Sequence, residues 1–197
     1  MKSSYLLSAL FCLFIINSTA QTVDSTSKPV SNNSQAAGSE LYFMERYYQI
    51  KASYPKLSKY YGQYAASSNS LVEFIKRYHE IKASYPTLPN EFGNYASSDY
   101  SLDEFLERLF AIKDSYPGLA QIYGYYAASK LSMDDFMKRY YQVRDAEPAL
   151  KIVYGEFAAS HRLLEDFSLR YFGAIDSNTG FTNGFGDYAG CKWNLAR

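Results

Sequence analysis

Residues 101–131 read SLDEFLERLFAIKDSYPGLAQIYGYYAASKL, and this stretch is one copy of the unit that decides the fold. It contains a serine followed by an acid three residues later, a central Tyr-Pro step, and a glycine followed by an alanine three residues later. The same features recur on both sides at a fixed spacing of 31 residues. A fixed period of this length predicts a tandem array of identical supersecondary units.

The array begins at residue 39 and contains five units without an insertion or deletion between them. We assign the units to residues 39–69, 70–100, 101–131, 132–162 and 163–193, the last of them degenerate. Phenylalanine, arginine and glycine recur in all five units, and proline recurs in the first four. These positions are Phe43, Phe74, Phe105, Phe136 and Phe167; Arg46, Arg77, Arg108, Arg139 and Arg170; Gly62, Gly93, Gly124, Gly155 and Gly186; and Pro55, Pro86, Pro117 and Pro148.

Each unit is predicted to form two helices. Ser101 and Glu104 have the spacing of a capping box, in which each side chain binds a free backbone N–H of the other residue. The apolar residues that follow have helical spacing and predict an amphipathic first helix. In the middle unit they are Leu102, Phe105, Leu109 and Ile112. The Tyr-Pro step ends this helix, because the residue before proline avoids helical angles, and Pro117 suits the first position of a second helix.

The repeated arginine and glycine have structural interpretations. The acid of the capping box precedes the arginine by four residues, as in Glu104 and Arg108, so we predict an exposed ion pair rather than a ligand-binding group. Glycine inside a helix costs about 1 kcal/mol relative to alanine. Its return in every unit therefore predicts the close approach of a neighbouring helix or an aromatic ring, such as the repeated phenylalanine. The alternative is that the second helix ends at the glycine and restarts after it.

The last unit departs from the pattern. Leu163 replaces the capping serine and Thr179 replaces the proline. Because the end of an array lacks a neighbour, this unit is predicted to be a C-terminal cap, with residues 193–197 as a tail. The layout resembles helical-hairpin solenoids of the tetratricopeptide type, although the period is not 34 residues and their tryptophan signature is absent. The predicted fold class is all-α, a solenoid-like array of five helical hairpins.

The residues before the array have the features of a secretory leader. Residues 1–20 combine Lys2, an apolar run at 5–16 and small residues before a cleavage position after Ala20, which is typical of a signal peptide. The apolar run is shorter than the roughly 20 residues of a spanning helix, so an uncleaved anchor is the weaker alternative. Residues 21–38 are rich in Ser, Thr, Asn and Gln and are predicted to be disordered. Asn32 in this leader is a candidate N-glycosylation site.

Charge and cysteine content restrict the partners. The chain has 20 basic and 20 acidic residues without a run of one sign, which argues against a nucleic-acid partner or a basic membrane patch. Cys12 lies in the predicted signal peptide, so the mature chain keeps only Cys191. This residue is a candidate for an intermolecular disulfide, and the alternative is a buried thiol at a frayed C-terminus.

The sequence offers no constellation of residues for catalysis. His79 and His161 are the only histidines, and no motif for a nucleophile, a metal or a phosphate loop occurs. His79 occupies a column that is otherwise aromatic, so it is interpreted as a packing or surface residue. We therefore predict no catalytic residue, no cofactor and no metal site, and a protein that is not an enzyme.

Three non-enzymatic functions fit these observations. The first is a secreted structural or matrix component, because 21 tyrosines offer stacking surfaces and phenols that can be cross-linked. The alternative is a secreted binding module, such as an effector or toxin-like ligand, with an exposed Tyr/Arg surface. The third is a precursor of repeated peptides, cut at the dibasic sites of residues 76–77 and 138–139. An extracellular protein or matrix component, or a second copy of the chain, is the expected partner, without a membrane anchor.

The tyrosines are predicted to divide between core and surface. Those at apolar repeat positions are assigned to the core, and those in the Tyr-Pro step and in doublets are assigned to partly exposed sites. The first group is Tyr64, Tyr95 and Tyr126, and the second is Tyr54, Tyr85, Tyr116, Tyr60 and Tyr61.

Overall fold

A computed structural model describes residues 42–177, 180–181 and 183–195. The predicted signal peptide (1–20), the leader (21–38) and Asn32 lie outside these residues. The described part is helical and has no strand beyond an isolated bridge between Tyr42 and Asn194. None of the helices described is both long and apolar enough to span a bilayer. The all-α prediction is thus confirmed for this part of the chain.

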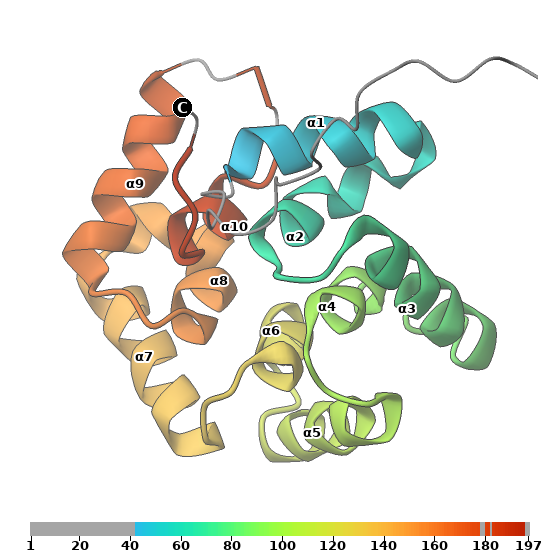
Figure 1. The fold of residues 1–197 in the computed structure, drawn as a ribbon. Helices are drawn as coiled ribbons and strands as arrows, with labels where there is room; N and C mark the ends of the chain where they lie inside the picture. Colours follow the sequence, from blue (N-terminus) through green and yellow to red (C-terminus); the bar gives the residue numbers. More distant parts are fainter. Residues whose placement is uncertain (1–41, 178–179, 182, 196–197) are drawn as a thin grey trace, which may run out of the picture. The chain divides into compact units, whose positions relative to one another are not determined.

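The first helix of each unit lies on the outside of the molecule, as Figure 1 shows. These outer helices are α1 (Phe43–Ser53), α3 (Leu71–Ser84), α5 (Leu102–Ser115), α7 (Met133–Ala146) and α9 (Leu164–Asp176). Ser70, Ser101 and Ser132 cap three of them, each hydroxyl accepting a hydrogen bond from the backbone N–H three residues later. The predicted capping box is complete at Ser101, whose backbone N–H donates to Glu104 Oε2 at 2.9 Å.

The second helix of each unit is shorter than predicted and lies on the inside (Figure 1). These inner helices are α2 (Tyr61–Ala66), α4 (Phe92–Ser97), α6 (Tyr123–Ala128), α8 (Tyr154–Ala159) and α10 (Phe185–Gly190). Each begins one residue before the repeated glycine, so the prediction that the helix passes through the glycine is confirmed and the alternative is wrong.

The prolines do not open these α-helices, which corrects the prediction. Pro55 and Pro148 start the 3₁₀ helices η1 (Pro55–Tyr60) and η3 (Pro148–Val153). Pro86 and Pro117 stand in turns, and η2 (Ala120–Ile122) follows the second of them. In η1 and η3 a leucine leaves helical angles, with φ −99° and ψ 27° at Leu57. This bend interrupts the α-helical hydrogen bonds until the inner helix begins.

The inner helices close into a ring. Each packs against its own outer helix and against the inner helices of both neighbouring units, in the order α2, α4, α6, α8, α10. The series does not stop at α10, because α10 packs against α2 (Figure 1). Unit five is therefore not a cap without a neighbour, as predicted: it packs against unit four on one side and against unit one on the other.

Aromatic pairs join each unit to the next. The aromatic residue two positions after the repeated glycine packs edge-on against the repeated phenylalanine of the following outer helix. The pairs Tyr64–Phe74, Tyr95–Phe105, Tyr126–Phe136, Phe157–Phe167 and Tyr188–Phe43 have ring centroids 5.3, 5.4, 5.4, 5.3 and 5.4 Å apart. The fifth pair joins the last unit to the first with the same geometry as the others. The repeated phenylalanines are all fully buried, so they form the core of the ring.

The last described residues complete the first helix of the chain. In α3 the N–H of Phe74 donates to the carbonyl of the capping residue Ser70 at 2.9 Å. In α1 the N–H of Phe43 donates to the carbonyl of Asn194, also at 2.9 Å. Asn194 follows Leu163 by one repeat, so the register continues across the junction. Trp193 Nε1 also donates to the carbonyls of Ala66 and Ser67, at 3.1 and 3.3 Å. Residues 193–195 are thus a closing segment and not a tail.

The repeated arginines bind backbone carbonyls, which corrects the predicted exposed ion pairs. Arg108 donates to the carbonyls of Tyr126, Ser129 and Leu131 at 3.1, 2.9 and 2.8 Å, and its guanidinium lies 4.3 Å from the centroid of the Tyr126 ring. The other four arginines, Arg46, Arg77, Arg139 and Arg170, bind the ends of their own inner helices in the same way. The last carbonyls of a helix lack internal partners, and one guanidinium with five N–H groups satisfies several of them. In the described residues no arginine of this column pairs with its capping acid.

Candidate functional site

Each repeated glycine makes room for a side chain of the preceding unit. A β-carbon on Gly155 would overlap the ring of Tyr125, and one on Gly62 would overlap the carboxylate of Asp187. The same relation places Gln63 against Gly93, Asn94 against Gly124, and Glu156 against Gly186. The close approach predicted at the glycines is therefore present, but the approaching residue is the one that follows the neighbouring glycine and not the repeated phenylalanine.

This contact leads to a prediction for two helical glycines. Gly155→Ala forces a methyl group into the Tyr125 ring and is expected to destabilise the protein by about 1 to 3 kcal/mol, the usual cost of overpacking. Gly173→Ala is the matched control, because nothing lies within 4 Å of a β-carbon there. Alanine favours the helix at that position by up to about 1 kcal/mol. Urea unfolding of both variants measures the difference, and equal midpoints would contradict the contact.

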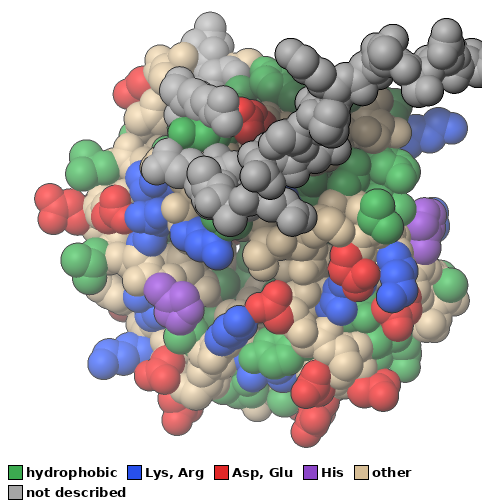
Figure 2. Space-filling model, viewed as in Figure 1, with side chains coloured by type: hydrophobic (Ala, Val, Ile, Leu, Met, Phe, Trp, Pro, Cys, Tyr) green, Lys and Arg blue, Asp and Glu red, His purple; other side chains and the backbone are tan. Residues whose placement is uncertain are grey.

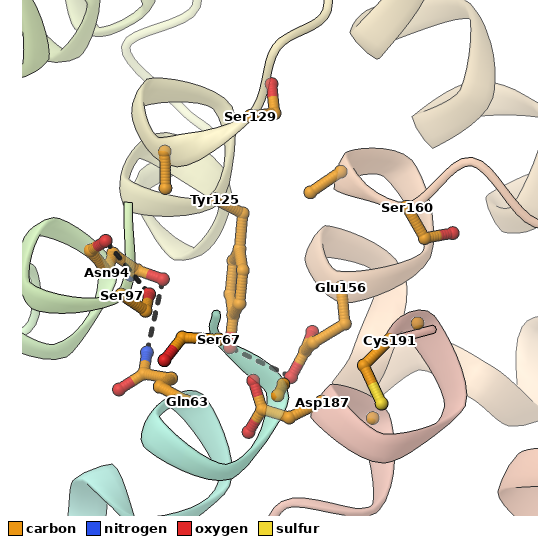
Figure 3. Close-up of a pocket in the computed structure, with 15 residues that line it drawn as sticks. Gln63, Ser67, Asn94, Ser97, Tyr125, Ser129, Glu156, Ser160, Asp187 and Cys191 are labelled. Atoms are coloured by element: carbon orange, nitrogen blue, oxygen red, sulfur yellow. Dashed lines mark hydrogen bonds between the residues drawn. The ribbon is translucent and has the colours of Figure 1, made fainter. Parts of the chain in front are cut away.

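The residues that follow the glycines form one column on the ring axis. They are Gln63, Asn94, Tyr125, Glu156 and Asp187, and we call them the axial residues. Together they line a cavity of about 230 Å³ between the five inner helices (Figure 3). Small residues such as Ala128 and Ala159 also line it. All five axial residues differ, although the glycine before them is the same in every unit.

The cavity continues toward both ends of the inner helices. A hollow of about 610 Å³ shares the five axial residues and is lined further by Lys59, Glu91 and Gln121, near the helix N-termini. A hollow of about 390 Å³ near the C-termini is lined by Asp99, His161, Arg162 and Lys192, among others. On the face shown in Figure 2, acidic and basic side chains interleave around the ring.

Hydrogen bonds fix four of the axial side chains. Gln63 Nε2 donates to Asn94 Oδ1 at 3.1 Å, and Asn94 Nδ2 donates to Glu91 Oε2 at 3.4 Å. The hydroxyl of Tyr125 donates to Glu156 Oε1 at 2.8 Å (Figure 3). Neither Glu156 nor Asp187 forms an ion pair with a basic side chain of the described residues. Two neighbouring carboxylates therefore lie inside the ring without a countercharge.

The two axial acids have strongly perturbed pKa values. Burial, together with the nearby charge of Asp187, raises the pKa of Glu156 from 4.5 to about 8. Burial raises the pKa of Asp187 from 3.8 to about 7. Both side chains are half-buried in the cavity, and the loss of surrounding water disfavours their ionised forms. Burial and these two acids also raise the pKa of Tyr125 well above 10, which keeps its phenol protonated as a donor.

These pKa values predict how stability depends on pH. The folded state binds more protons than the unfolded state between about pH 4 and pH 8, so stability falls as pH rises through this interval. Glu156→Gln removes the acid with the larger pKa shift, so the free energy of unfolding should fall less steeply as pH rises. At about pH 8.5 the variant should be more stable than wild type by on the order of 2 kcal/mol. Thermal unfolding across this interval is the measurement. An identical slope in wild type and variant would show that Glu156 titrates normally.

Cys191 belongs to the repeat and is not part of a frayed end. It occupies the position of Ser67, Ser98, Ser129 and Ser160, which follow the other inner helices. Like their hydroxyls, its thiol donates to the carbonyl three residues earlier, with Sγ 3.2 Å from the oxygen of Tyr188. Burial raises its pKa to about 11. A buried, protonated thiol disfavours disulfide exchange, and the intermolecular disulfide stays a prediction.

The other residues with a predicted environment are His79 and eight tyrosines. His79 is exposed in the column of Tyr48, Phe110, Tyr141 and Phe172, as expected. The core assignment of Tyr64, Tyr95 and Tyr126 is confirmed, and Tyr54, Tyr85 and Tyr116 are partly exposed as predicted. The prediction for Tyr60 and Tyr61 is wrong, because both are buried at the junction before α2.

The axial residues were not among the predicted sites, because the predictions used repeated positions and the axial position carries a different residue in each unit. The signal that identifies them is a different residue directly after the same glycine in every unit. No protein-family model, no curated protein and no solved structure matches this chain, so the roles of these residues are inferred from the geometry of the ring and its cavity.

Proposed function

We propose that this protein is a secreted, non-enzymatic binding module that holds a small ligand in its axial cavity. The observation that carries the proposal is the variation of the axial residues. Each unit has equivalent neighbours on both sides, so a purely structural column would repeat, as the columns of Phe105, Arg108 and Gly124 do. A ligand without five-fold symmetry requires a different side chain from each unit. Concave sites with a few converging polar groups are the usual form of small-molecule sites.

The chemistry of the cavity favours binding over catalysis. Cys191 lines the same cavity, but a thiol with a pKa of about 11 stays protonated and is a poor nucleophile. The two acids and the phenol of Tyr125 provide proton donors and acceptors, and no nucleophile with an adjacent base accompanies them among the lining residues. The repeated arginines are occupied by backbone carbonyls, so the cavity replaces the Tyr/Arg surface as the candidate binding site.

A structural or matrix component is the second candidate. One column of residues faces outward on the outer helices and exposes about two fifths of each aromatic side chain: Tyr48, Phe110, Tyr141 and Phe172. Tyr54 and Tyr85 are exposed to a similar extent, so four tyrosines with partly exposed side chains are candidates for oxidative cross-linking. Detection of dityrosine in the secreted material would favour this function. The peptide precursor ranks last, because both dibasic sites lie inside helices, in α3 and α7.

A cavity-filling substitution tests the proposal. Ala128 lines the cavity, and Ala128→Leu places three more carbon atoms in it. Ala111→Leu adds the same atoms on the exposed face of α5 and is the matched control. Wild-type protein is screened with a library of small metabolites by native mass spectrometry. We expect binding to wild type and to Ala111→Leu, and at least about tenfold weaker binding to Ala128→Leu, a difference of about 1.4 kcal/mol. Equal binding by all three proteins, or none, would contradict the proposal.

A further inference from the structure

The charges around the axial cavity are unbalanced. Glu156 of α8 and Asp187 of α10 line its centre, and Glu91 lines the hollow at the start of α4. Lys59 of η1 is the one basic residue among the described residues that line these two spaces, and it is exposed and donates to Asn90 Oδ1 at 2.8 Å. The faces contributed by α2, α4 and α6 carry the neutral groups of Gln63, Asn94 and Tyr125. Acidic side chains therefore outnumber basic ones three to one along these two spaces.

Asp187 is the clearest sign of a missing partner. Its carboxylate projects from α10 toward the side of the cavity where the Tyr125 hydroxyl meets Glu156 (Figure 3). Its side chain forms no hydrogen bond or ion pair with any described residue, and burial is the cause of its raised pKa. A carboxylate removed from water without a partner is costly, and a pair of them more so.

We propose that the axial cavity binds a small organic cation whose ammonium group is held by Glu156, Asp187 and the oxygen of Tyr125. This inference rests on the proposed function and specifies its ligand class. An ammonium group has three N–H donors, which match the three acceptors supplied by these side chains. Hydrogen bonds from a cation to a carboxylate are shorter and stronger than neutral ones. One bound charge supplies the countercharge that the ring itself does not provide.

The shape of the cavity favours an organic cation over a metal ion. In the described residues no group of three or more His, Cys, Asp or Glu side chains is placed to hold a metal. Calcium requires six to eight oxygen ligands, more than this cluster offers. Beyond the acids the wall carries serines such as Ser67 and Ser160, and its apolar part is formed by Ala66, Ala128 and Ala159. This apolar part suits a short hydrocarbon chain attached to the ammonium group.

Protons and the cation compete for the same carboxylates. Below about pH 7 both acids are protonated and the cavity is neutral, whereas above about pH 8 both ionise. Lys59 lines the hollow beside these acids, and the ionisation of Glu91, whose pKa is raised by burial, adds to the negative potential. The affinity for an ammonium ligand should therefore rise with pH.

Isothermal titration calorimetry on the mature chain tests this ligand class. The probe is n-butylamine, which stays protonated throughout, and 1-butanol is its neutral counterpart. We expect n-butylamine to bind at least about tenfold more tightly at about pH 8.5 than at about pH 5.5, and 1-butanol to bind at least about tenfold more weakly than the amine. Glu156→Gln and Asp187→Asn should each weaken amine binding by about tenfold or more. Glu107→Gln, on the exposed face of α5, is the matched control and should leave binding unchanged.

The outcomes separate this inference from the proposed function. Equal affinity of wild type, Glu156→Gln and Asp187→Asn for the amine would overturn the ammonium site, and so would binding of calcium but not of the amine. If 1-butanol binds as tightly as the amine and Ala128→Leu blocks it, the cavity is a ligand site but not a cation site. If neither the probes nor any compound of the library binds, both the cation site and the proposed function are contradicted. Thermal unfolding shows that each variant is folded before it is titrated.

Discussion

A chain that ends at Gly190 is expected to lose its cooperative unfolding transition. The deletion removes residues 191–197, among which the carbonyls of Asn194 and Leu195 accept from Phe43 and Met44 in α1. The carbonyls of Cys191 and Trp193 accept from the half-buried guanidinium groups of Arg162 and Arg170. It also removes the indole of Trp193 from unit one. A buried donor left without an acceptor costs about 1 to 3 kcal/mol. Several such losses together reach the total stability of a domain, about 5 to 15 kcal/mol.

Circular dichroism during urea unfolding measures this effect. The intact chain should unfold in one transition, and the shortened chain should show a shallow loss of helix that begins without denaturant. Lys192→Ala, an exposed position in the same segment, should match the intact chain. An unchanged midpoint for the chain ending at Gly190 would mean that the units are stable as an open array.

The second large effect is expected at the repeated phenylalanine. Phe105 is 0% exposed and packs on Tyr95 with ring centroids 5.4 Å apart, so Phe105→Ala should cost about 3 to 5 kcal/mol. Phe110 lies one and a half turns later in the same helix and is 42% exposed. Phe110→Ala removes the same atoms from the surface and should cost less than about 1 kcal/mol.

Equilibrium unfolding in urea compares these two variants with wild type. Both substitutions lie in α5 and remove a phenyl group. The difference between their free energies of unfolding therefore reports burial and not helix propensity. Similar midpoints for the two variants would mean that the repeated phenylalanine is not part of a closed core.

The periodic features of the sequence predicted the outer helices well. The capping serines, such as Ser101, and the apolar spacing that includes Phe105 depend only on neighbours within one unit. The closure of the ring depends on the small rotation between successive units, which no residue pattern within a unit reports. The sequence contains one indication of ring closure: Asn194 follows Leu163 by 31 residues, so the repeat register continues beyond the fifth unit.

The arginine and the axial residues show two other limits of the sequence. Arg108 has the spacing of an ion pair with Glu104, and the same spacing lets it reach the carbonyls at the end of α6. The carbonyls prevail because Tyr126 and Ser129 lie in the buried part of the unit, where a charged donor contributes more than an exposed ion pair does. The axial cavity exists only when the ring is closed, since Asp187 lies against Gly62 from the opposite end of the array. A search for repeated motifs within a unit therefore does not find it.

The closed ring is tested most directly by the contact between Gly62 and Gly184. A β-carbon on Gly62 would lie 2.5 Å from the Cα of Gly184, so the two backbones touch although 122 residues separate them in the sequence. Nuclear Overhauser spectroscopy on isotopically labelled protein measures this contact through the α-protons of the two glycines. The closed ring predicts a strong cross-peak between them. An open array places these glycines at opposite ends, and the absence of the cross-peak in a spectrum that shows the contact between Gly155 and Tyr125 would contradict the ring.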